Sequence, residues 1–126
     1  MRMQTRASGH PGRDLPPDRN TVSTPHFELV SGSDGVSLEL VLAGDLDMAA
    51  TFKIEPELDR LLAGKKIRRL LIDIAAVRFI DSAGLGALLS IRERTRQLRI
   101  DMTLVNVSEP VRRILDLSGT SAVFRD

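Results

Sequence analysis

The hydrophobic pattern changes its period at Ser82, and this change limits the folds open to the chain. Upstream, the apolar run from Leu70 to Ile74 is too short for a helix and is typical of a strand covered on both faces. Downstream, apolar residues recur near helical spacing at Leu85, Leu88, Leu89, Ile91 and Leu98. The stretch therefore predicts a buried strand that turns into a helix, with a serine at the turn.

Two strands and one helix are predicted before this stretch. Phe27 to Val30 and Val36 to Leu42 alternate like the strands of a hairpin around a glycine-containing turn, residues 31–35. The spacing of Ile54, Leu58, Leu61 and Leu62 predicts a helix that ends near Ala63, with Gly64 as its C-cap. Pro56 predicts a kink in this helix, or a regular part that begins only near Glu55.

One strand and two helices are predicted after the serine. The helix that follows Ser82 extends to about Arg99, and residues 101–107 form a fourth strand. A third helix begins with Ser108 as its cap and Pro110 in its first turn, and Ser118-Gly119 ends it. Residues 122–124 form at most one short strand. The expected fold is α/β, with about three helices on a mixed sheet of four to five strands: an N-terminal hairpin strand and a parallel βαβ core.

Length and composition indicate one domain with a tail. The 126 residues suffice for a single core. Residues 1–25 are rich in Pro, Gly and Arg and have no apolar face, so we expect a flexible N-terminal tail, with the domain spanning 26–126. The tail carries both His10 and, at its border, His26, which we expect to be solvated.

Charge and residue usage exclude several classes of function. The formal net charge is +1, and aromatic residues make up 3% of the chain, which argues against a nucleic-acid surface. The chain contains no cysteine, which excludes disulfides and fits a cytoplasmic location. No apolar stretch is long enough to span a membrane or to act as a signal peptide. We expect no metal and no cofactor.

The predicted topology brings polar side chains to one edge of the sheet. Strands that end near Leu42, Ile74 and Val107 run parallel, so their carboxyl ends share an edge, where ligands of open α/β sheets usually bind. The loops at this edge carry Asp45, Asp47, Asp81, Ser82 and, at its far side, Asn106 and Ser108. We expect these residues to lie in one neighbourhood.

Several roles are open to Ser82. It lies at a helix N-terminus, which can hold a phosphate, or Ser82 or Asp81 can simply cap the helix. A catalytic serine is disfavoured because the turn lacks the first glycine of a nucleophile elbow and the domain lacks a histidine base. A P-loop is disfavoured because no Lys-Ser/Thr pair follows Gly86. A phosphoaspartate receiver is disfavoured because no lysine follows Lys66. We therefore expect no catalytic residue and no enzyme.

Three motifs in register resemble the STAS domain of anti-sigma-factor antagonists. They are Gly44–Asp47 after the second strand, Asp81–Gly86 at the serine turn, and Pro110–Gly119 in the last helix. The resemblance spans about Phe27 to Phe124. It implies that Ser82 is a phosphoacceptor for a partner that is both anti-sigma factor and serine kinase, with a phosphatase as a further partner. The unphosphorylated form would bind the anti-sigma factor and free the sigma factor, with neither nucleic acid nor membrane as a partner.

The resemblance also assigns the surface that contacts the partner. This surface comprises Asp45, Asp47, Asp81, Ser82, Ala83, Gly84 and Leu85. Ala83 stands where many members of the family have a second Ser or Thr, which leaves Ser82 as the one acceptor of the turn. The sequence ends at Asp126, where many members of the family continue into a helix that packs on the sheet, so we expect either a shortened domain or a partner that covers the sheet. The alternative is a STAS scaffold, or a subunit of a regulatory or lipid-transport complex, in which Ser82 is never modified.

Overall fold

The computed structural model describes residues 18–64 and 66–124, which form a sheet with helices on one face. The strands are β1 (Asp18–Thr24), β2 (Phe27–Ser33), β3 (Ser37–Leu46), β4 (Arg69–Ile80) and β5 (Asp101–Val105). The helices are α1 (Met48–Leu62), α2 (Ser82–Gln97) and α3 (Glu109–Ser118), followed by a 3-10 helix, η2 (Ser121–Phe124).

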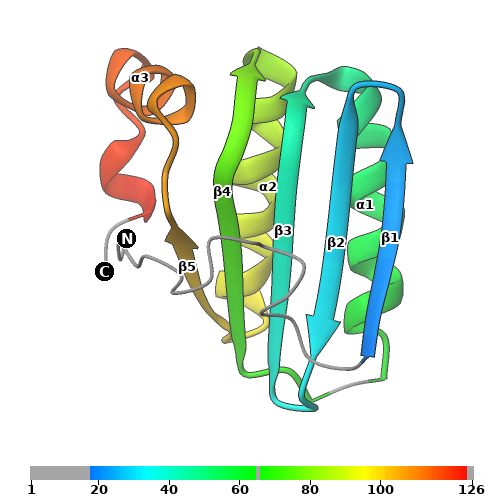
Figure 1. The fold of residues 1–126 in the computed structure, drawn as a ribbon. Helices are drawn as coiled ribbons and strands as arrows, with labels where there is room; N and C mark the ends of the chain where they lie inside the picture. Colours follow the sequence, from blue (N-terminus) through cyan, green and yellow to red (C-terminus); the bar gives the residue numbers. More distant parts are fainter. Residues whose placement is uncertain (1–17, 65, 125–126) are drawn as a thin grey trace.

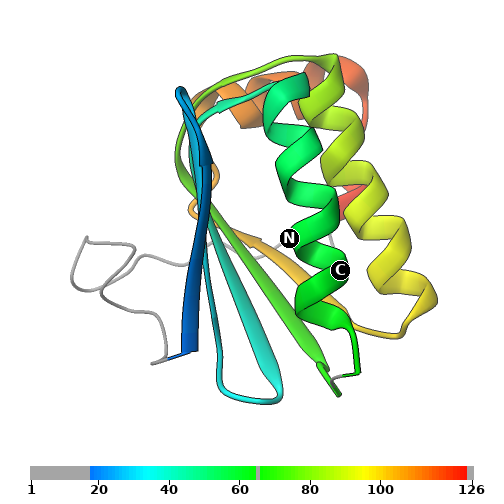
Figure 2. The ribbon, with the colours of Figure 1, turned by 90° about the vertical axis from the view of Figure 1, so that its right-hand side faces the viewer.

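The strands lie side by side in the order in which they occur in the sequence (Figure 1). β1 and β2 are antiparallel, as are β2 and β3, whereas β3, β4 and β5 are parallel. Both parallel connections step in the same direction, and right-handed crossovers then place α1 and α2 on the same face of the sheet (Figure 2). The predicted α/β fold with a mixed sheet and three helices is confirmed.

The core lies between the sheet and these two helices. Every second residue of the central strands points into it, as Leu38, Leu40 and Leu42 do on β3. The helices contribute apolar side chains at helical spacing, including Ile54, Leu58, Leu61, Leu88 and Ile91. An ion pair between Asp59 of α1 and Arg94 of α2 joins the two helices on their outer side.

Two β-bulges interrupt the C-terminal half of β4. Between Val41 and Ala43, and again between Gly44 and Asp45, β4 contains one residue more than β3 in the pairing register. At the first of these bulges, the carboxylate of Asp73 accepts a hydrogen bond from the backbone N–H of Ala75 at 3.0 Å. Bulges re-aim a strand next to functional sites, and these two set the direction in which β4 enters the serine turn.

The N-terminal strand corrects one expectation. Residues 18–24 were expected to belong to a flexible tail, yet they form β1 and pair with β2 along seven positions. Among their described side chains only Val22 packs against the core, so the strand is held by backbone pairing and leaves little hydrophobic signal. Residues 1–17, the rest of the expected tail, lie outside the described residues.

Smaller differences concern the ends of elements. Residues 121–124 form a 3-10 helix and not a strand, and Phe124 is buried by contacts of this turn. α1 begins at Met48 and runs through Pro56, so its regular part does not start near Glu55. Gly64 follows the C-cap residue Ala63 with a φ of 64°, a conformation that glycine adopts without strain.

Candidate functional site

Asp47 and Asp81 occupy equivalent positions at the ends of two neighbouring parallel strands. Leu46 pairs with Ile80 in the register of β3 and β4, so the residue after each strand is an aspartate. Each carboxylate caps the following helix: Asp47 accepts from the N–H of Ala50 at 3.0 Å, and Asp81 accepts from the N–H of Gly84 at 2.9 Å. The N-termini of α1 and α2 therefore meet at the same edge of the sheet, as the sequence predicts.

Gly84 lets the first turn of α2 lie on the end of β3. A Cβ at this position would overlap the backbone carbonyl of Leu46 and would also meet the side chain of Ile80. The N–H of Asp81 lies 3.4 Å from the same Leu46 oxygen. Gly84 is thus required for the close approach, whereas a Cβ at Gly86 would meet nothing within 4 Å.

Ser82 is the first residue of α2, and its side chain is exposed. Because Asp81 provides the cap, the Ser82 hydroxyl is not needed to begin the helix. The next residues, Ala83 and Leu85, are half-buried, and Leu85 packs against the core. A hydroxyl at the positive end of a helix dipole is well placed to accept and carry a phosphoryl group.

Asp45 lies at the same edge of the sheet, but its carboxylate binds a side chain and does not cap a helix. Its carboxylate forms an ion pair with Arg78 of β4, with 3.0 Å between Asp45 Oδ1 and Arg78 Nε. The pair bridges the second bulge, because Asp45 is aligned with Phe79. Arg78 was not among the candidates from sequence, since no pattern relates two residues 33 positions apart.

Asn106 and Ser108 lie in the loop between β5 and α3, on the side of this edge that is away from β3. The side-chain amide of Asn106 donates to Asp73 at 3.1 Å, and Asn106 itself has a φ of 54°. Ser108 occupies the N-cap position of α3 as predicted, but its side chain makes no capping hydrogen bond. Neither residue is joined to Ser82 by a hydrogen bond within the described part of the chain.

His26 also reaches this edge of the sheet, a placement that its position beside the expected tail did not indicate. Its backbone carbonyl accepts a hydrogen bond from the N–H of Asp45 at 2.7 Å, and its side chain is exposed. It precedes β2, two strands from β4, and adjacent strands lie roughly 4.8 Å apart. The imidazole is therefore separated from Ser82 by the width of β3. His10 lies outside the described residues.

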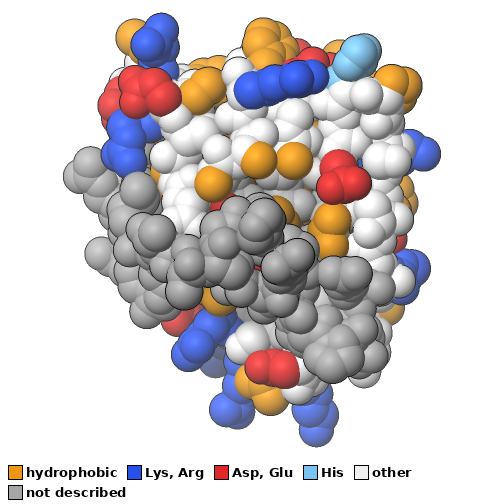
Figure 3. All heavy atoms as spheres, in the orientation of Figure 1, with side chains coloured by type: hydrophobic (Ala, Val, Ile, Leu, Met, Phe, Trp, Pro, Cys, Tyr) orange, Lys and Arg blue, Asp and Glu red, His pale blue; other side chains and the backbone are white. Residues whose placement is uncertain are grey.

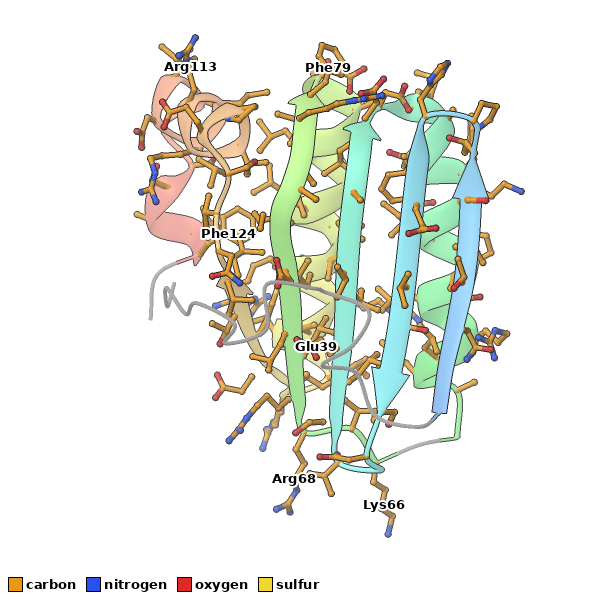
Figure 4. The ribbon with its side chains drawn as sticks, in the orientation of Figure 1. Glu39, Lys66, Arg68, Phe79, Arg113 and Phe124 are labelled. Carbon is orange, nitrogen blue, oxygen red and sulfur yellow. The ribbon has the colours of Figure 1, made fainter. Side chains whose placement is uncertain are left out.

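An apolar groove opens beside the serine turn, and the sequence reasoning missed it. It has a volume of about 360 Å³ and lies between the end of β4 and α3. Its lining residues are Arg78, Phe79, Ile80, Glu109, Pro110, Arg113, Ile114 and Leu117. Figure 4 shows Phe79 and Arg113 at this end of the molecule, with Lys66 and Arg68 at the opposite end. Leu117 is 81% exposed and Phe79 is 49% exposed, so the groove presents apolar surface to solvent.

Two features are absent from residues 18–64 and 66–124. No group of three or more His, Cys, Asp or Glu side chains in these ranges is arranged to hold a metal ion. No helix in the same ranges has both the length and the apolar character needed to cross a membrane.

Comparison with known proteins finds relatives in sequence and in fold. An anti-sigma F factor antagonist from Paenibacillus polymyxa is 28% identical over 78 residues, which cover 62% of this chain and 67% of the relative. The solved structure of an anti-sigma factor antagonist from Mycobacterium paratuberculosis superposes with a TM-score of 0.70 at 23% identity, covering 82% of this chain and 88% of that one.

A second solved structure has the same fold. The anti-sigma factor antagonist SpoIIAA in its unphosphorylated form superposes with a TM-score of 0.63 at 18% identity, covering 82% of this chain and 83% of that one. The model of the STAS domain matches residues 29–125, which include both capping aspartates, the serine turn and the groove. The chain therefore belongs to the STAS domain family.

Proposed function

We propose that this protein is an anti-sigma factor antagonist controlled by phosphorylation of Ser82. In its unphosphorylated form it binds an anti-sigma factor that is also a serine kinase, and thereby frees the sigma factor. Phosphorylation by that partner ends the binding, and a phosphatase restores it. The names of the relative from Paenibacillus polymyxa and of both solved structures support the general role.

The observation that carries the proposal is the exposed hydroxyl at the start of α2. Asp81 caps the helix, so Ser82 is available for modification without loss of the cap. In this proposal Ser82 is the substrate of a partner kinase and not a catalytic nucleophile of this protein, and no histidine side chain in the described residues forms a hydrogen bond with it. In this proposal the chain is a binding protein and not an enzyme.

A phosphate on Ser82 changes the charge of a surface that is already acidic. It adds about −1.5 to −2 charges at pH 7, beside the carboxylates of Asp47 and Asp81. The helix N-terminus compensates about 0.3 to 1 kcal/mol of the resulting repulsion. A partner surface that fits the free hydroxyl of Ser82 would be repelled by the negative charge of the phosphate and would clash with its volume. A loss of about 2 to 3 kcal/mol in binding free energy weakens binding roughly 30- to 150-fold. Binding is switched without a change of fold.

The proposed contact surface has an acidic centre and an apolar side. Its centre consists of Asp45, Asp47, Asp81, Ser82, Ala83, Gly84 and Leu85. The groove between β4 and α3 continues this surface, because Ile80 at its wall directly precedes Asp81. Exposed Phe79 and Leu117 supply the apolar area that binding energy requires, while the carboxylates select the partner.

The proposal is tested by binding measurements with candidate anti-sigma factor kinases. Ser82→Ala should bind as tightly as the unmodified protein, and Ser82→Asp should bind at least tenfold more weakly. Ser90→Asp is the matched control, since Ser90 is also exposed on α2 but lies two turns further along the helix. Equal affinity of Ser82→Asp and Ser82→Ala would refute the switch.

The kinase step has a separate readout. Incubation with the partner and ATP should add about 80 Da to the protein, the mass of one phosphoryl group, and peptide mapping should place it on Ser82. The Ser82→Ala variant should gain no mass. Tight binding of a partner without any mass change would favour the alternative, a STAS scaffold in a regulatory or lipid-transport complex in which Ser82 is never modified.

A further inference from the structure

β4 is longer than the strand that pairs with it on its outer side. β4 has 12 residues, and the 5 residues of β5 pair with residues 69–73. Residues 74–80 have β3 as their neighbour on one side. On their other side, the described ranges 18–64 and 66–124 provide no strand. The end of β4 is therefore an edge, which we call the free edge of β4 (residues 74–80).

The backbone of the free edge is accessible. Ala75, Ala76, Arg78 and Phe79 are exposed, although β4 is not the outermost strand of the sheet. Besides pairing with β3, the described residues give the backbone of this stretch one hydrogen bond, from the N–H of Ala75 to Asp73. Backbone N–H and C=O groups are strong hydrogen-bonding groups, so an unpaired row of them is a template for a further strand.

The groove between β4 and α3 runs beside this free edge. α3 stands opposite the edge because the chain turns away from β4 after β5, at Asn106, which has a φ of 54° and donates its side-chain amide to Asp73. Residues 78–80 form the strand wall of the groove, and α3 forms the other wall. Its volume of about 360 Å³ lies within the range of about 300 to 1,000 Å³ that is usual for binding sites.

Apolar side chains of the groove are partly in solvent. Leu117 of α3 is 81% exposed and Phe79 of β4 is 49% exposed, and Ile114 is half-buried between them in exposure. Figure 3 shows hydrophobic side chains beside cationic and acidic ones at this end of the molecule, at the top of the view. Exposed apolar surface with a charged rim is typical of a site that binds another protein.

An unpaired strand edge beside an apolar groove and a helix fits one mode of peptide recognition, the addition of a β-strand. In this mode, main-chain hydrogen bonds hold an extended peptide along the edge, and the groove accepts every second side chain. A helical segment in the groove would leave the backbone groups of the edge unpaired. The seven residues 74–80 offer enough length for a strand of about five to six residues.

The charges around the groove indicate the chemistry of the segment. Arg78 is paired with Asp45. Arg113 Nη2 lies 3.9 Å from Glu109 Oε1, and the two side chains are 70% and 71% exposed, so this ion pair contributes little to stability. The guanidinium of Arg113 is therefore able to bind a carboxylate of an incoming segment.

We propose that the anti-sigma factor inserts an extended segment between the free edge of β4 and α3. The segment adds a strand to the sheet, places alternate apolar side chains in the groove and pairs an acidic side chain with Arg113. The inference rests on the proposed function and adds to it the way in which the partner is held. The added strand lies next to the serine turn, because Ile80 at the end of the free edge directly precedes Asp81.

Amide hydrogen exchange tests the strand pairing in the full chain. NMR records the exchange rate of each backbone amide in the free protein and in the complex with the anti-sigma factor. Amides of the free edge that do not pair with β3 should exchange at least about tenfold more slowly in the complex. Amides of the turn at residues 34–36, at the opposite end of the sheet, should keep their rates and serve as the internal reference.

Synthetic peptides of the anti-sigma factor locate the segment. Overlapping peptides of about 12 residues are long enough to contain one strand, and one of them should compete with the intact partner. Methylation of the alternate backbone nitrogens that face the free edge keeps the side chains and removes the donors for strand pairing. This peptide should bind at least about tenfold more weakly, whereas methylation of the nitrogens that face away should have a smaller effect.

Charge reversal provides matched variants of the protein. Arg113→Glu replaces attraction for an acidic side chain by repulsion and should weaken binding of the anti-sigma factor about tenfold or more. Arg99→Glu makes the same change at an exposed arginine between α2 and β5, at the opposite end of the sheet, and should leave binding unchanged. Circular dichroism checks that both variants are folded.

Failure of this inference is distinguishable from failure of the proposed function. Binding that responds to Ser82→Asp while exchange at the free edge is unchanged overturns the added strand alone. A peptide that keeps its affinity after methylation of its edge-facing nitrogens also overturns it, because the groove is then filled without strand pairing. Equal effects of Arg113→Glu and Arg99→Glu overturn the acidic contact. If no anti-sigma factor distinguishes Ser82→Asp from Ser82→Ala, the proposed function fails and this inference fails with it.

Discussion

Gly84 packs its Cα against the carbonyl group of Leu46, and this contact fixes the height at which α2 begins above the end of β3. An alanine at position 84 must push the helix away from the strand, because its Cβ would meet backbone and not a flexible side chain. We expect Gly84→Ala to lower the free energy of unfolding by about 1 to 3 kcal/mol. Urea unfolding curves measure the change.

Gly86→Ala is the control for this substitution. Gly86 lies one half-turn further along the same helix and has open space around the added methyl group. Since alanine is the better helix former, we expect Gly86→Ala to raise stability by about 0.5 to 1 kcal/mol. If Gly84→Ala raised stability as much as Gly86→Ala, helix propensity alone would account for both variants and the contact with Leu46 would not restrict position 84.

The two capping aspartates should contribute similarly to stability. Asp47→Ala and Asp81→Ala each remove a carboxylate that accepts a backbone N–H in the first turn of a helix. We expect each variant to lose about 1 kcal/mol in the free energy of unfolding. Asp81→Asn keeps a capping oxygen and should lose much less, which separates the cap from the charge. Equal losses for Asp81→Ala and Asp81→Asn would contradict this assignment.

Unlike the two capping aspartates, Ser31 has a buried side-chain hydroxyl for which the described part of the chain provides no hydrogen-bond partner. Its side chain is 0% exposed, and its oxygen makes no hydrogen bond in the described part of the chain. A buried polar group without a partner costs stability, so Ser31→Ala should leave the free energy of unfolding unchanged or raise it by up to about 1 kcal/mol. Thr95→Val is the contrast, because the Thr95 hydroxyl donates to the carbonyl of Arg92 at 2.9 Å. That variant should lose about 1 kcal/mol in thermal or urea unfolding.

The part of the site that could be predicted from sequence depends on short-range patterns. The change of period at Ser82, the aspartate before it and the glycines after it all lie within a few residues, so strand, cap and helix follow from local rules. The placement of Asp47 and Asp81 at one edge of the sheet also followed, because parallel strands place their carboxyl ends together. These inferences required no knowledge of packing.

The features that escaped prediction depend on residues far apart in sequence. Strand β1 has one described apolar contact with the core, through Val22, and is recognised only by its pairing with β2. The bulges of β4 appear only when its register with β3 is known. The groove between β4 and α3 likewise depends on how the loop at Asn106 turns, and that turn is held by Asp73, 33 residues away. Tertiary contacts, and not local propensity, set these features.

Asp34 gives the turn between β2 and β3 a dependence on pH. Its carboxylate accepts hydrogen bonds from the N–H groups of Ser37 at 2.7 Å and Val36 at 3.1 Å. These bonds, that of Ser37 foremost, favour the charged form and lower the pKa of Asp34 below its ordinary value. The resulting stability is present above the pKa of the unfolded chain and is lost as pH falls through the lower pKa of the folded state. An NMR titration should show Asp34 ionising below about pH 3.9; a midpoint at or above that value would contradict the hydrogen bonds.

Two exposed leucines at opposite ends of the domain distinguish the proposed partner surface from the rest of the protein. Leu117 is 81% exposed and lines the groove beside the serine turn, whereas Leu98 is 53% exposed at the other end of the sheet, between α2 and β5. Because both side chains are largely in solvent, Leu117→Ala and Leu98→Ala should each change the free energy of unfolding by less than about 0.5 kcal/mol. A leucine side chain that becomes fully buried in an interface contributes about 1.5 to 3 kcal/mol through the apolar surface removed from water. Calorimetric titration with the anti-sigma factor should therefore show at least fivefold weaker binding for Leu117→Ala and unchanged binding for Leu98→Ala. The reverse order of effects would place the partner at the Leu98 end of the sheet, away from Ser82, and phosphorylation of Ser82 could not then act by contact.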